Sequence, residues 1–141
     1  MKKVIRLLPV TAFVCFLGVA LTGCPSGDKD AKKVTTGAAS PDTITVKQGA
    51  EATATVKITL GKDLKKGTVK ASVKDAKNVD VTVDPATIEK TGETSVKVTV
   101  KAKDDAEVTD KGIIEVTPTI EGATPAATAA TIKLKVEAKA K

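Results

Sequence analysis

The chain has 141 residues, enough for one ordinary domain, and a formal net charge of +6. Three of its 23 basic residues, Lys2, Lys3 and Arg6, lie in the first 23 positions, which leaves 20 lysines against 17 acidic residues in the remainder. No arginine follows Arg6 and no basic cluster remains, so the composition excludes a nucleic-acid-binding surface.

Residues 1–23 have the organisation of a secretory signal peptide. A basic start precedes an apolar run over Leu7–Leu21, and the small residue Gly23 stands at the expected cleavage site. An uncleaved membrane helix is the alternative. It needs about 20 apolar residues, whereas this run is shorter and Pro9 interrupts its start.

The cleavage region Leu21-Thr22-Gly23-Cys24 resembles the lipobox of bacterial lipoproteins. The resemblance implies that Cys24 receives a diacylglycerol thioether, that cleavage occurs before it, and that the mature protein is anchored to a membrane by lipid. An ordinary secreted protein with a chance cysteine is the alternative. In this family Pro25, rather than Asp, after the cysteine favours the outer membrane where a cell has two. We therefore expect a location in the cell envelope, outside the cytoplasm.

Residues 24–40 are predicted to form a flexible tether. The segment Pro25–Ser40 is rich in Gly, Ser, Ala, Lys and Asp, and it has no apolar periodicity. Sixteen such residues give a mean reach of about 20–24 Å. The folded domain is predicted to occupy residues 41–138.

Strict alternation of apolar and polar residues predicts that this domain is all-β. Turn residues such as Gly49, Gly61 and Pro85 separate the alternating runs. About seven strands at this spacing favour an antiparallel immunoglobulin-like sandwich, with a small barrel as the alternative. The predicted strands are Thr43–Lys47, Ala52–Leu60, Thr68–Val73, Val79–Val83, Ser95–Ala102, Gly112–Ile120 and Thr131–Ala138.

The inward positions of these strands carry small or medium aliphatic residues. A sandwich usually includes a large central aromatic, but both phenylalanines, Phe13 and Phe16, lie in the signal peptide, so we expect a thin core. The predicted core is Ile44, Val46, Val56, Ile58, Leu60, Val69, Ala71, Val73, Val81, Val83, Ile88, Val96, Val98, Val100, Ile114, Val116, Ile120, Ile132, Leu134 and Val136.

The runs TITVKQGAEATATVKITL, VDVTVDPATIEKTGETSVKVTVKAKDDAE and TIKLKVEA resemble bacterial Ig-like repeats of surface and cell-wall-associated proteins. The resemblance covers about residues 41–138 and implies the same sandwich fold. It rests on Val, Thr and Lys alternation, so it says little about function. Such repeats commonly carry an aromatic in the late strand, where this chain has Gly112-Ile113-Ile114.

Few residues suit catalysis. The chain has no histidine, the commonest general base and a frequent metal ligand. If Cys24 is acylated, no thiol remains, and Ser72 and Ser95 fall on polar sides of predicted strands. We therefore expect no enzyme, no cofactor and no catalytic or metal-binding residues, and we assign only the lipidation site at Cys24.

The leading hypothesis is a non-catalytic, lipid-anchored envelope protein that acts as a protein-interaction or structural module, with an envelope protein as its partner. The alternative is a ligand-binding lipoprotein, in one of two forms. An acidic turn of Asp104, Asp105, Glu107 and Asp110 offers the oxygen ligands that Ca²⁺ prefers, although a solvated turn is the simpler interpretation. A lysine-rich face offers charge to an anionic wall polymer. Outward lysines such as Lys57, Lys97, Lys133 and Lys135 are expected to guard the sheet edges and keep the sheets soluble.

Overall fold

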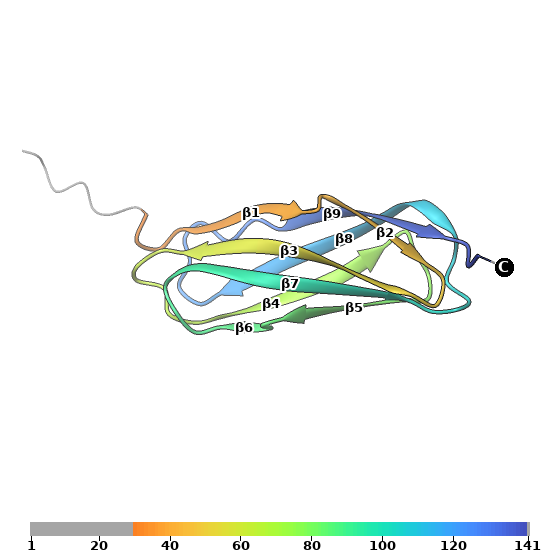
Figure 1. The fold of residues 1–141 in the computed structure, drawn as a ribbon. Helices are drawn as coiled ribbons and strands as arrows, with labels where there is room; N and C mark the ends of the chain where they lie inside the picture. Colours follow the sequence, from red (N-terminus) through yellow and green to blue (C-terminus); the bar gives the residue numbers. More distant parts are fainter. Residues whose placement is uncertain (1–29, 141) are drawn as a thin grey trace, which may run out of the picture.

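The computed structural model describes residues 30–140, which form nine β-strands and no helix (Figure 1). The predicted signal peptide, the lipobox and Cys24 lie outside these residues. No helix in the described range has the length and apolar character needed to cross a membrane. The prediction of an all-β fold is confirmed.

Two packed sheets make up the domain, rather than the single closed sheet of a barrel. We call them the β3/β7 sheet and the β8/β9 sheet. Their orders, β1-β3-β7-β5 and β2-β9-β8-β4-β6, contain the A-B-E-D and G-F-C arrangements of an immunoglobulin-like sandwich. The strands of the first sheet are β1 (Val34–Ser40), β3 (Glu51–Leu60), β7 (Gly92–Ala102) and β5 (Val79–Asp84). Those of the second are β2 (Thr43–Lys47), β9 (Ala130–Glu137), β8 (Thr109–Ile120), β4 (Gly67–Lys74) and β6 (Thr87–Ile88).

All seven predicted strands are present, but one pairing differs from the expected antiparallel arrangement. Strand β2 lies parallel to β9, with Ile44 opposite Leu134 and Val46 opposite Val136. The chain leaves the β3/β7 sheet at Ser40 and enters the other sheet at Thr43. So short a connection closes one side of the sandwich without a hairpin.

The predicted boundary between tether and domain is wrong, because residues 34–40 form strand β1 against β3. Val34 and Ala39 bury their side chains in the core. The register shifts between Thr36 and Ala39, where a bulge breaks the period of two. That bulge hides the strand from a search for alternation, and Gly37 within it adds to the linker-like composition.

The segment before β1 is also fixed to the domain. Ala31 is buried, and its carbonyl accepts a hydrogen bond from the Asp63 amide at 2.9 Å. The amide of Gly61 donates to Lys33 O at 2.9 Å, and that of Thr124 donates to Lys32 O at 3.0 Å. The loops after β3 and β8 thus hold residues 31–33 at one end of the sandwich.

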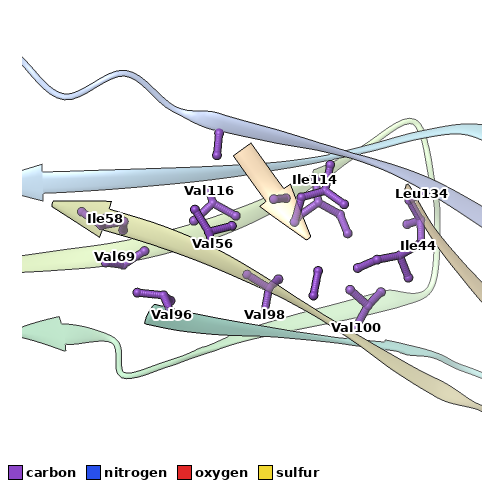
Figure 2. Close-up of a cluster of buried hydrophobic side chains, with 14 of the residues drawn as sticks. Ile44, Val56, Ile58, Val69, Val96, Val98, Val100, Ile114, Val116 and Leu134 are labelled. Carbon is purple, nitrogen blue, oxygen red and sulfur yellow. The ribbon is translucent and has the colours of Figure 1, made fainter. Parts of the chain in front are cut away.

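Aliphatic side chains from both sheets fill the space between them (Figure 2). Among residues 30–140 no charged or polar residue is buried. All but four of the predicted core residues are buried, and the exceptions are Ala71, Val73, Val81 and Val83 on β4 and β5. These strands lie at the uncovered side of the sandwich, so their inward side chains are only half-buried.

The sequence pattern also missed part of the core. Leu64 is buried although it lies in a loop, and several buried alanines went unassigned because alanine suits either face of a strand. The missed residues are Ala31, Val34, Ala39, Ala54, Leu64, Ala102, Ala106 and Ala130.

Two threonine hydroxyls point into the core without a partner. Thr36 and Thr94 flank Ile58 on adjacent strands, and neither Oγ1 has a hydrogen-bond partner. An unsatisfied buried hydroxyl costs about 1–3 kcal/mol. We predict that Thr94→Val raises the free energy of unfolding by about 1 kcal/mol, because the isosteric methyl group needs no partner.

Guanidinium titration of the purified protein measures this change. The matched control, Thr59→Val on the exposed face of β3, is expected to shift stability by less than about 0.5 kcal/mol. A lower stability in Thr94→Val than in the control contradicts the assignment.

Candidate functional site

Four segments gather at the end of the sandwich opposite residue 30, and we call this region the distal loop end (Figure 1). The segments are the β2–β3 turn (48–50), the β4–β5 loop (75–78), the β7–β8 loop (103–108) and the C-terminal residues 138–140. In β-sandwiches, loops clustered at one end of the strands are common binding surfaces.

The side chain of Gln48 joins three of these segments. Its Nε2 donates to Ala106 O at 2.7 Å, and its Oε1 accepts from the Lys139 amide at 3.2 Å. Next to it, Gly49 has a φ of +75° and donates its amide to Ala102 O at 3.0 Å. This positive φ favours glycine, and a Cβ at this position would also displace the exposed Asp104 side chain, whose Oδ1 it would meet at 2.5 Å.

The β4–β5 loop fixes the other side of the β7–β8 loop. Asn78 adopts a φ of 57°, and its Nδ2 donates to Asp105 O at 3.2 Å and to Asp105 Oδ2 at 3.0 Å. Backbone bonds from the Lys103 amide to Asn78 O and from the Glu107 amide to Lys77 O reinforce the contact. The distal loop end is therefore a bonded unit rather than a set of independent loops.

A hollow of about 710 Å³ opens between the two loops. Its lining mixes both charges, and Lys77 Nζ lies 3.8 Å from Glu107 Oε2. Nearby, Val108 is the one large apolar side chain among the described residues that is strongly exposed, at 56%. The hollow is lined by Asp75, Ala76, Lys77, Glu107, Thr109 and Lys111. Val108 does not line this hollow but lies with Lys135 and Val136 of β9. A mixed-charge hollow and a separate exposed valine suit contact with a protein surface more than capture of a single ion.

The four acidic residues considered for Ca²⁺ do not converge. Asp104 pairs with Lys139 at 2.9 Å, Asp105 accepts from Asn78, and Glu107 faces Lys77. Asp110 lies beyond them, in β8. Within residues 30–140 no three potential metal ligands come together.

The outward lysines do not form one shared face that could bind an anionic polymer. Lys57 and Lys97 project from the β3/β7 sheet, whereas Lys133 and Lys135 project from the β8/β9 sheet on the other side of the sandwich. Two of them also form ion pairs, Lys57 with Glu93 at 3.0 Å and Lys135 with Glu137 at 2.8 Å. The sandwich therefore divides this charge between two surfaces.

The described residues show no catalytic arrangement. Ser72 and Ser95 are exposed, and within the described range neither side chain makes a hydrogen bond. No titratable group here is buried, so none has the desolvated environment that tunes catalytic residues. Cys24, the assigned lipidation site, lies outside the described residues.

No protein-family model and no curated protein sequence matches this chain. Solved structures with similarity include S-layer protein SbsC domains 4 and 5 (19% identity, TM-score 0.40, 66% of this chain and 46% of that one) and the periplasmic chaperone SfaE (11%, 0.49, 76% and 58%). A family 123 glycoside hydrolase from Clostridium perfringens is also similar (15%, 0.46, 77% and 27%). The chain spans less than two thirds of each of these structures, and likeness at this level carries no argument about function.

Removal of the Gln48 side chain tests the cohesion of the distal loop end. We predict that Gln48→Ala lowers the free energy of unfolding by about 1–2 kcal/mol, because it removes two hydrogen bonds between segments. It also accelerates amide hydrogen exchange in the β7–β8 loop. The control, Glu51→Ala at an exposed position three residues on, leaves both unchanged. Equal exchange in the two variants contradicts the role of Gln48.

The exposed pair Lys135–Glu137 predicts a pH dependence. The hydrogen bond from Lys135, together with its charge, lowers the pKa of Glu137 and raises the pKa of Lys135. The stabilisation is therefore present between the ordinary pKa of glutamate and that of lysine. It is lost as pH falls through the lowered pKa of Glu137 or rises through the raised pKa of Lys135.

We expect Lys135→Gln to raise the pKa of Glu137 in an NMR titration, and the control Lys133→Gln to leave it unchanged. The difference in melting temperature between wild type and Lys135→Gln then disappears at acidic pH. A Glu137 pKa that is the same in wild type and Lys135→Gln contradicts the interaction.

Proposed function

We propose that this protein is a lipid-anchored, non-catalytic module of the bacterial envelope that presents its distal loop end to a protein partner. The observation that carries this proposal is the fixed position of residues 31–33 at the opposite end of the sandwich. With the lipid on Cys24, that end is the one beside the membrane.

The number of residues between Cys24 and the described part of the chain supports this orientation. Asp30 lies six positions after Cys24, and a fully extended chain spans at most about 3.3–3.6 Å per residue, or roughly 20 Å. Strand β8 has 12 residues, and at about 3.4 Å per residue it carries the distal loop end roughly 40 Å farther out. The lipid therefore holds one end near the headgroups and leaves the other accessible.

Charge at the anchored end agrees with this placement. Lys32 and Lys33 precede β1, and the loop after β3 carries Lys65 and Lys66. All four are exposed, Lys33 pairs with Asp30 at 3.6 Å, and the backbone bonds of Gly61 and Asp63 keep the two segments together. Lysines close to an anionic membrane surface contribute about 1 kcal/mol each, so they favour this end facing the lipid.

Site-specific photocrosslinking in cells tests the proposal. A photoreactive residue at Val108, on the distal loop end, is expected to yield a discrete protein adduct. The same residue at Glu121, in the exposed loop after β8 at the anchored end, yields no such adduct. Cys24→Ser abolishes the Val108 adduct, because without lipid the module is no longer held beside its partner.

Mass spectrometry of the same samples reports the N-terminus. A lipidated Cys24 at the start of the mature chain supports the anchor. An unmodified N-terminus, or an adduct that forms equally from both probe positions, contradicts the proposed function. An enzymatic activity abolished by a single substitution in the purified protein contradicts its non-catalytic part.

A further inference from the structure

On the side of the sandwich formed by the edges of β4 and β5, the described chain crosses between the sheets only at the two ends, through the 75–78 loop and through Pro85 and Ala86, which lead from β5 to β6. We call the stretch between these two crossings the open side. The opposite side is closed by the chain itself, where it passes from β1 to β2. At the open side, the inward side chains of Ala71, Val73, Val81 and Val83 are only half-buried. Short β6 covers just the start of β4, through Gly67 and Thr68. The open edge is thus apolar inside and long enough for a further strand.

The backbone groups that face outward on β4 can be identified. The Val69 amide donates to Ala86 O at 2.8 Å, so the backbone N–H and C=O groups of Val69 point away from β8. Because directions alternate along a strand, Ala71 and Val73 also present their N–H and C=O groups outward. The Val69–Pro118 pair therefore needs no hydrogen bond from Pro118, which agrees with the missing amide of proline.

The same reasoning applies to β5. The Lys103 amide donates to Asn78 O at 3.0 Å, so the backbone groups of Asn78 point toward β7. The even-numbered residues of β5 therefore bond to β7, and Val81 and Val83 present their backbone groups outward. Both edges expose the backbone of their odd-numbered residues, which are also the half-buried ones.

The charges on these two edges are complementary. The solvent-facing side of β4 carries Lys70 and Lys74, and that of β5 carries Asp80 and Asp84 at the same spacing of four residues. Within the described part of one copy, Lys70 and Asp84 form no ion pair, whereas Lys74 pairs with Glu115 at 2.8 Å and Asp80 pairs with Lys103 at 3.6 Å. A contact of Lys70 with Asp84 therefore carries the charge complementarity. Contact of β4 with another β4 opposes lysines, and contact of β5 with another β5 opposes aspartates. Only β4 against β5 brings opposite charges together.

We propose that a second copy of this chain docks at the open side, with β4 of each copy antiparallel to β5 of the other. The register places Lys70 opposite Asp84, Ser72 opposite Thr82 and Lys74 opposite Asp80. In that register the outward backbone groups of Ala71 and Val73 meet those of Val83 and Val81. The charge pairing and the hydrogen-bond direction thus select the same alignment.

The end of the ladder is also defined. One position beyond the Lys70–Asp84 pair, the Val69 amide is already bonded to Ala86 O of its own copy. The partner residue arriving there is Pro85, which has no amide to donate. Strand β6 therefore stays in place, and the added ladder stops where β6 begins.

A twofold axis parallel to the strands generates this arrangement. In the dimer, the β3/β7 sheet of each copy continues into the β8/β9 sheet of the other. The two junctions cover the half-buried valines. Such an axis keeps the strand directions, so residue 30 of both copies lies at the same end. Two anchored copies therefore reach one membrane, although the dimer itself does not depend on lipidation of Cys24.

Charge exchange tests the dimer in the full purified chain in detergent, by sedimentation velocity. Wild type is expected to sediment as a dimer. Lys70→Glu and Asp84→Lys each raise the dimer dissociation constant roughly tenfold or more, because each replaces two attractive pairs by like charges. The double variant Lys70→Glu/Asp84→Lys restores the dimer. The control, Lys47→Glu at an exposed position of β2 on the other side of the sandwich, leaves it intact.

A disulfide test fixes the register. Ser72 and Thr82 form a non-hydrogen-bonded pair across the interface, with Cα atoms about 4.5 Å apart, within disulfide reach. A mixture of differently tagged Ser72→Cys and Thr82→Cys chains is expected to form a mixed disulfide, whereas Ser72→Cys alone forms none. A monomer at all concentrations overturns the proposal. A dimer that neither Lys70→Glu nor Asp84→Lys weakens also overturns it. Disulfide formation between two Ser72→Cys chains overturns it as well.

Discussion

The structure depends on the burial of every second side chain between two sheets, with small aliphatic residues alone. The domain has no aromatic residue or disulfide, so its stability rests on the close packing of valine, isoleucine and leucine. No charged or polar residue is buried in residues 30–140. Chemistry is therefore confined to the surface, and function falls to the ends and edges of the sandwich.

The two ends of the sandwich differ in how they are built. At one end, backbone bonds from Gly61, Asp63 and Thr124 hold the chain before β1. At the other, Gln48 and Asn78 join the loops and the C-terminal residues through side-chain bonds. The proposed lipid at Cys24 would turn this difference into an orientation, because at most roughly 20 Å of chain separates Cys24 from Asp30. The open edge of β4 and β5 lies along the side, between the two ends, so it competes with neither.

Most of the fold was predictable from the sequence, since each of the seven expected strands alternates cleanly. Strand β1 was not, because the bulge between Thr36 and Ala39 breaks the period that identifies a strand. The parallel pairing of β2 with β9 was also not predictable, because alternation indicates which side chains face the core and not the direction in which a strand pairs. The half-buried state of Val73 and Val81 depends on which strands lie at the edges, and this is a property of topology.

The candidate site was less predictable than the fold. The acidic turn was identified by composition, but its carboxylates bond to Lys139, Asn78 and Lys77 instead of converging. Gln48 contacts Ala106 across 58 positions, and no local pattern signals such a contact. The nearest signal was Gly49 in the turn, whose positive φ places it against Asp104. Sequence reasoning located the segments but not the bonds between them.

The most direct test of this account is the orientation of the domain on a membrane. A fluorophore is attached to Thr124→Cys at the anchored end, or to Val108→Cys at the distal loop end, of the lipidated protein in vesicles with a headgroup quencher. The account predicts strong quenching at residue 124 and little at residue 108, since the two ends lie roughly 40 Å apart along the strands. Equal quenching at both positions, or stronger quenching at residue 108, contradicts it.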